Sequence, residues 1–77
     1  MIRKRSVLIA GHATSVTLET VFWDELTVMA EARGASVNQL VAEIDSGRGG
    51  NLSSAIRVFV LTELKRKAAE PPPAANP

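Results

Sequence analysis

The sequence predicts a mainly α-helical fold with one short β-element, and it predicts that this element pairs with a second copy of the chain. Residues 13–18 alternate in polarity with a period of two, which is typical of a half-buried strand. Apolar residues then recur with helical spacing in three successive segments. Because a lone strand ahead of helices has no sheet partner of its own, pairing between two copies is the simplest arrangement.

The predicted strand, 13–18, has two different faces. Val16 and Leu18 point to one side, where they can pack onto helices. Ser15 and Thr17 point to the other side, where short hydroxyl side chains face outward.

Two layouts are open for the residues before this strand. In one, residues 1–12 are a basic arm that leads into a single strand. In the other, they contain the first strand of a hairpin that turns at residues 11–12, with glycine at the first central position of a type II′ turn. That hairpin would place Val7 opposite Val16 and Ile9 opposite Thr14.

The first helix is expected over about Thr20–Arg33, because its apolar residues form one stripe. We place Phe22 at the centre of the stripe and Trp23 at its border. Gly34 suits the left-handed position that ends a helix, and Ser36 can cap the helix that follows.

Two more helices are expected. The second begins after Ser36 and stops before the glycine-rich segment 46–50. The third is capped by Asn51 or Ser53 and continues to about Lys67, where its cationic last turn complements the helix dipole.

Composition divides the chain into three parts. Residues 1–12 are the arm or first hairpin strand, residues 13–67 form the domain with its additional C-terminal helix, and residues 68–77 are expected to be a disordered Pro/Ala tail. With 77 residues, 45% hydrophobic, the chain is small for a single-chain core, which favours burial between protomers. It has no cysteine, and no segment approaches a membrane span, so we expect a soluble, cytoplasmic protein.

Catalytic chemistry is not indicated. The single histidine, His12, sits beside a glycine and is interpreted as a turn or surface residue. The serines have no evident His or Asp partners, and the carboxylates are scattered singly on helices. We therefore expect no enzymatic activity, no metal and no cofactor.

Binding to nucleic acid is better supported. Two copies of the strand would form a two-stranded ribbon that fits the roughly 12 Å major groove of B-DNA, with the hydroxyls of Ser15 and Thr17 at base edges. Backbone N–H groups around Val37 and Asn38 would present partial positive charge to phosphates. The basic triplet, residues 3–5, could add sequence-independent phosphate contacts.

These residues form a recognisable pattern. It consists of T-S-V-T-L at 14–18, then F-W-D-E-L at 22–26, then R-G-A-S-V-N-Q-L at 33–40. The pattern resembles the ribbon–helix–helix family of Arc/MetJ-type transcriptional regulators, and specifically its short bacterial members. The likeness extends over about residues 3–64, because N-L-S-S-A-I-R-V-F-V-L at 51–61 also resembles that subfamily.

The resemblance implies an intertwined homodimer with an intermolecular antiparallel β-ribbon. The base-contacting residues would be Ala13, Ser15 and Thr17. The phosphate-contacting residues would be Arg3, Lys4, Arg5, Ser36, Val37 and Asn38. The dimer core would contain Val16, Leu18, Phe22, Leu26, Leu40, Val41 and Ile44.

The predicted function is that of a homodimeric regulator that binds specific double-stranded DNA, with its β-ribbon in the major groove. It would repress transcription by occluding polymerase, and dimers could assemble further on DNA. The alternative is a protein-interaction module or antitoxin-like dimer that uses the C-terminal helix to bind a partner protein.

Overall fold

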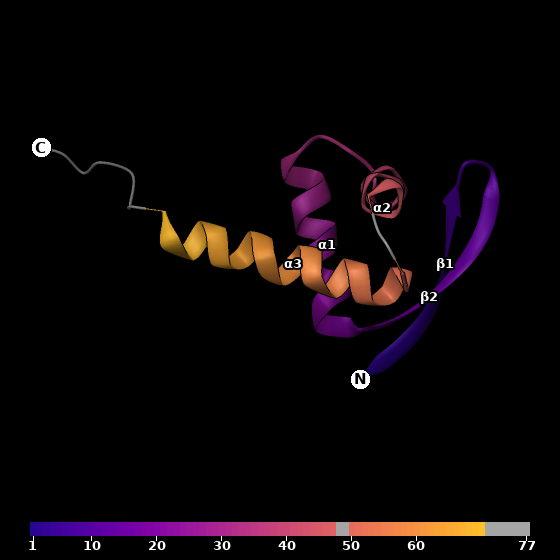
Figure 1. The fold of residues 1–77 in the computed structure, drawn as a ribbon, viewed down its shortest axis with the longest axis horizontal. Helices are drawn as coiled ribbons and strands as arrows, with labels where there is room; N and C mark the ends of the chain where they lie inside the picture. Colours follow the sequence, from indigo (N-terminus) through magenta and orange to yellow (C-terminus); the bar gives the residue numbers. More distant parts are fainter. Residues whose placement is uncertain (48–49, 71–77) are drawn as a thin grey trace, which may run out of the picture.

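A computed structural model describes residues 1–47 and 50–70 of the chain. In this part a β-hairpin precedes three helices, and α1, α2 and α3 all lie to one side of it (Figure 1). The elements are β1 (Ile2–Ile9), β2 (His12–Glu19), α1 (Thr20–Ala32), α2 (Val37–Ser46) and α3 (Leu52–Ala69). The fold is therefore mainly α with a short β-element and an additional C-terminal helix.

Of the two layouts open for the N-terminal residues, the structure has the hairpin. Strands β1 and β2 are antiparallel, and eight residue pairs run from Ile2–Glu19 at the open end to Ile9–His12 at the turn. Val7 lies opposite Thr14, and Val16 lies opposite Arg5. The register expected from the sequence, with Val7 opposite Val16, is therefore wrong by two residues.

The turn explains this difference. Ala10 and Gly11, with φ of 51° and 82°, form a two-residue loop of the kind in which both central residues have positive φ, as in a type I′ turn. Both registers keep the same side chains on the same face, so alternation alone does not distinguish them. The observed register brings the Met1 carbonyl to Thr20, whose N–H (2.8 Å) and hydroxyl (3.0 Å) both donate to it. This contact begins α1 where Glu19 provides no side-chain cap.

The core lies between the inner face of the hairpin and the helices. Each helix contributes one side chain with no exposed surface: Leu26 from α1, Val41 from α2 and Ile56 from α3. From the hairpin, the core includes Val7, Val16 and Leu18. Burial of each such side chain contributes about 1.5–3 kcal/mol, so this shared core holds the hairpin to the helices.

Local signals end and begin the helices as the sequence indicates. Gly34 has a φ of 67°, the left-handed conformation expected after α1. Ser36 and Gln39 form a reciprocal capping box at the start of α2. At the start of α3, Asn51 accepts a hydrogen bond from the Ser54 N–H, so Asn51 is the cap.

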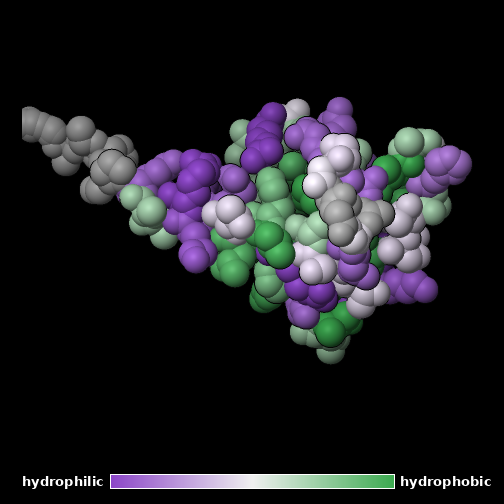
Figure 2. All heavy atoms as spheres, in the orientation of Figure 1, coloured by the Kyte–Doolittle hydropathy of each residue, from purple (hydrophilic) through white to green (hydrophobic). Residues whose placement is uncertain are grey.

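Helix α3 extends beyond the rest of the described molecule, and hydrophilic residues cover its C-terminal turns (Figures 1 and 2). It ends at Ala69, two residues later than expected, so positions 68 and 69 are helical rather than part of a tail. Glu70 is the C-cap of α3 and has an extended backbone, and the rest of the expected tail, residues 71–77, lies outside the described residues. Near the middle of α3, Glu63 pairs with Arg33 at the end of α1, at 3.5 Å.

The turn generates a stability prediction. Because an L-residue in the left-handed region costs about 1–2 kcal/mol, Ala10→Asn should raise the free energy of unfolding by about 1 kcal/mol by forming the favoured Asn-Gly pair. Gly11→Ala should lower it by about 1–2 kcal/mol, through backbone strain alone, since no atom lies within 4 Å of an added Cβ. Urea denaturation measures both. Equal stability of Gly11→Ala and wild type would contradict the turn geometry.

Candidate nucleic-acid interface

The side of the hairpin away from the helices is exposed and carries two parallel rows of side chains, which we call the outer face. The β2 row consists of Ala13, Ser15 and Thr17, all exposed. The β1 row, on the neighbouring strand, consists of Ile2, Lys4, Ser6 and Leu8, also exposed. The structure thus places the three predicted base-contacting residues together on one surface.

Each free edge of the hairpin is contacted by the start of a helix. On the β1 side, the Leu8 N–H donates to Oδ1 of Asn38, at 3.2 Å, in the first turn of α2. On the β2 side, the Thr17 N–H donates to Oγ of Ser53, at 3.1 Å, in the first turn of α3. These contacts place a helix N-terminus beside each edge of the outer face.

Arg57 fastens α3 to the end of β2. Its Nε lies 2.7 Å from Oε1 of Glu19, and its Nη2 donates to the carbonyl of Thr17 at 3.4 Å. This hydrogen bond from Arg57, together with one from the Glu19 backbone, holds the pKa of the Glu19 carboxyl below its ordinary value of 4.5. With Ser53, Arg57 occupies both backbone polar groups of Thr17 at the strand edge.

The basic triplet is divided between the two sides of the hairpin. Lys4 belongs to the outer face, whereas Arg3 and Arg5 lie at the alternate positions. The Arg5 guanidinium lies over the ring of Trp23, 4.7 Å from its centroid, on the helix side. The three residues predicted as equivalent phosphate contacts therefore have different surroundings.

The other predicted phosphate contacts lie at the start of α2. Ser36 and Asn38 are exposed, while Val37 is half-buried and packs against the core. The capping box occupies the Ser36 and Gln39 N–H groups with side-chain acceptors. Within residues 1–47 and 50–70, the N–H groups of Val37 and Asn38 have no hydrogen-bond acceptor, as is usual in the first turn of a helix.

The predicted core residues lie in the core of the single chain. Val16, Leu18, Leu26, Leu40 and Val41 are buried there. Phe22 and Ile44 are partly buried and pack against these residues. Their packing across a dimer stays a prediction.

Sequence reasoning does not identify three features of this surface: the β1 row, Ser53 as an edge contact, and Arg57. The sequence leaves both an arm and a hairpin strand open for residues 1–12, so it does not indicate that a β1 row exists. A signal for Arg57 is present, since it is the single charged residue in the apolar stretch from Ala55 to Leu61. For Ser53 the sequence indicates only a helix cap.

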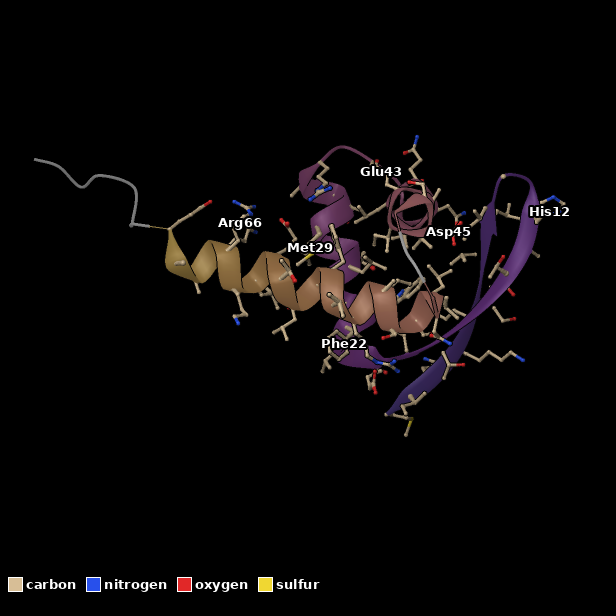
Figure 3. All side chains as sticks on the ribbon, viewed as in Figure 1. His12, Phe22, Met29, Glu43, Asp45 and Arg66 are labelled. Atoms are coloured by element: carbon tan, nitrogen blue, oxygen red, sulfur yellow. The ribbon has the colours of Figure 1, made fainter. Side chains whose placement is uncertain are left out.

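Other chemistry finds little support in residues 1–47 and 50–70. His12 lies at the hairpin tip and projects away from the helices (Figure 3). These residues contain no group of three His, Cys, Asp or Glu side chains that could hold a metal ion. Among the described helices, none combines the length and apolar character needed to cross a membrane.

An apolar groove of about 670 Å³ lies between α2 and α3, on a different part of the molecule. Leu40 and Ile44 line it from α2, and Ala55 and Phe59 from α3. Val58, which is 62% exposed, also borders it.

Comparison with known proteins agrees with this architecture. A family model for the ribbon-helix-helix domain matches residues 2–64. The chain belongs to the ribbon-helix-helix family. The ribbon-helix-helix match begins in β1 and ends in α3, so the hairpin and most of the third helix belong to the matched region.

One solved structure similar to this ribbon-helix-helix chain is that of an uncharacterized protein from Bordetella pertussis Tohama I. The two are 33% identical, with a TM-score of 0.73, over 100% of this chain and 68% of that one. A search of curated proteins finds no match.

The Glu19–Arg57 contact generates a pH prediction. A carboxyl whose pKa is lower in the folded protein stabilises the fold above its unfolded pKa, and this stabilisation is lost as pH falls through the folded pKa. Glu19→Gln should therefore be less stable than wild type at about pH 7, and the difference should shrink as the pH is lowered into the acid range and Glu19 becomes protonated in the folded protein. Urea denaturation across a series of falling pH values measures it.

The matched control is Glu31→Gln, because Glu31 is exposed on α1 and has no ion pair within the described residues. At neutral pH it should lower the free energy of unfolding much less than Glu19→Gln does, because it breaks no ion pair. A Glu19→Gln variant as stable as wild type at every pH would show that this ion pair does not fasten α3 to β2.

Proposed function

We propose that the chain is a DNA-binding transcriptional regulator, a repressor that acts as a homodimer with the outer face of its hairpin in the major groove. Its mechanism is occlusion of polymerase and requires no catalytic chemistry. Family membership and the two-sided hairpin support this proposal.

The observation that carries the proposal is the exposure of Ser15 and Thr17 on a rigid strand. The neighbouring side chains Val16 and Leu18 are each 1% exposed, so the strand cannot rotate to hide its polar row. Short hydroxyl side chains can donate to or accept from base edges, and a two-stranded ribbon fits the major groove. The burial of Val16 and Leu18 therefore keeps the hydroxyl side chains of the β2 row exposed, where they can contact bases.

Phosphate contacts would come from beside the hairpin. Asn38 fixes the start of α2 against the β1 edge, so the free N–H groups of Val37 and Asn38 lie close to the outer face. A helix N-terminus carries partial positive charge and favours phosphate oxygens. Arg3 is exposed and adds a cation near the open end of the hairpin. Such contacts position the protein while the outer face reads sequence.

Exposed apolar side chains support the homodimer. Val21 and Val28 on α1, and Val58 and Leu61 on α3, are each more than half exposed. By their spacing, Val21 and Val28 share one face of α1, and Val58 and Leu61 share one face of α3; exposed apolar residues that gather on one face are typical of interaction sites. We place the dimer contact there, because the polar groups of Thr17 at the β2 edge already bond to α3. In the intermolecular ribbon predicted from the sequence, β2 would pair with β2 of the second copy. The Thr17 backbone would then bond to that strand instead of to α3.

The β2 row generates a prediction about DNA binding. The double variant Ser15→Ala with Thr17→Ala should bind its selected DNA sequence about tenfold or more weakly and lose base preference, while keeping its weak general affinity for DNA. Folding should be unchanged, because both side chains are exposed and the hydrogen bonds between α3 and Thr17 are made by the Thr17 backbone. Selection from a random duplex library, followed by titration of the enriched sequence, measures it.

The control is the double variant Ser46→Ala with Thr62→Ala, which removes two exposed hydroxyls from α2 and α3. It should bind like wild type. Unchanged sequence-specific binding by the Ser15/Thr17 variant would contradict the proposed function.

The dimer contact generates a separate prediction. Leu61→Glu should shift the protein from dimer to monomer in sedimentation velocity, since it charges the exposed apolar side of α3. Ser15→Pro should leave the dimer intact, because it removes only an N–H that faces the free β2 edge. Loss of the dimer in Ser15→Pro would instead support pairing of β2 with its copy.

A second candidate function is binding of a partner protein by α3, as in an antitoxin. The α2–α3 groove with exposed Val58 at its border favours it. A toxin gene beside the gene of this chain would support this role. Its product should then bind wild type but not a Val58→Glu variant.

A further inference from the structure

The hairpin register places a second row of side chains beside the predicted base contacts. Lys4 lies opposite Thr17, and Ser6 lies opposite Ser15. The N–H groups of Leu8 and Thr17 point away from the hairpin to helix side chains, so these rows form the non-hydrogen-bonded pairs of the ladder. Cα atoms in such pairs lie about 4.5 Å apart, which makes the two rows one continuous surface.

Lys4 is the cation on the outer face that is available to bind a ligand. Arg5 on the other side is stacked on Trp23. Glu19, the acidic residue at the end of β2, is held by Arg57. Lys4 is exposed and has no ion-pair partner in the described ranges, 1–47 and 50–70.

The side chains beside Lys4 leave its ammonium group accessible to a ligand. Its β1 neighbour Ser6, and Thr17 and Ser15 across the hairpin, are short, whereas lysine carries three donors on a flexible four-carbon stem. In the major groove, guanine presents two acceptors, O6 and N7, and lysine or arginine is their usual partner. The outer face therefore combines small hydroxyls and one long donor at its centre, with exposed Ile2 and Leu8 at the two ends of the β1 row.

Resting on the DNA-binding function proposed above, we infer that Lys4 is a specificity-determining residue that donates to O6 and N7 of a guanine in the major groove. The β1 row then reads DNA together with the β2 row. The hairpin of a single chain, with its strand axes about 4.8 Å apart, is narrow enough for both rows to enter a groove of about 12 Å. Arg3, at the alternate position, contacts the phosphate backbone instead.

The test compares four proteins in selection from a random duplex library at near-physiological salt: wild type, Lys4→Gln, Lys4→Arg and Arg3→Gln. Wild type should enrich a sequence with a fixed guanine. Lys4→Gln should lose the preference at that position and bind the wild-type sequence about ten- to hundredfold more weakly. Lys4→Arg should retain the guanine. Thermal melting checks that each exposed substitution leaves folding unchanged.

Arg3→Gln is the matched control, since it removes one positive charge from the adjacent position. It should keep the wild-type sequence preference, weaken binding to all duplexes alike, and reduce the salt slope by about one. If Lys4→Gln keeps the guanine and behaves in this same way, Lys4 is a phosphate contact and the inference is overturned while the proposed function stands. If wild type enriches no sequence, both are overturned.

Discussion

Burial of one face of the β1–β2 hairpin is the constraint on which the rest of the structure depends. A two-stranded hairpin is at best marginally stable in water, so Val7, Val16 and Leu18 must be covered by helices. Once they are covered, alternation along the strands forces Lys4, Ser15 and the side chains beside them outward. A slip of one residue would move polar side chains into the core, so the outer face is held by the free energy of the whole core.

The helices also complete the hairpin at its edges. A free strand edge leaves N–H and C=O groups unpaired, and such edges are prone to uncontrolled pairing with other chains. Asn38 from α2 and Ser53 from α3 each accept one of these N–H groups, and Arg57 donates to a carbonyl. The same contacts bring two helix starts beside the surface proposed to bind DNA. Edge protection and the placement of the proposed phosphate contacts thus arise from one set of hydrogen bonds.

Local patterns are sufficient to predict most of the elements. The alternation of polar and apolar residues in 13–18 predicts the strand, and Gly34 and Ser36 mark the α1–α2 boundary. Both signals are local, because alternation and helix caps depend on residues that are neighbours in the sequence. The hairpin register is not predictable in this way, since both registers bury the same faces and only the strained turn at Ala10 decides. The role of Arg57 depends on a contact across 38 residues, to Glu19, which no local pattern encodes.

The width of the sheet links the assembly of the protein to the reading of DNA proposed for it. If β2 paired with its copy, four strands would span about 14 Å between outer axes, more than the roughly 12 Å major groove. The β1 row, with Lys4, would then lie against the groove walls, where phosphates are the available partners. If the hairpin enters alone, Lys4 reaches base edges and the dimer must form elsewhere, on α1 and α3. The chemical partner of Lys4 therefore reports which strands enter the groove, and the bonds that α3 already makes with Thr17 favour entry of the single hairpin.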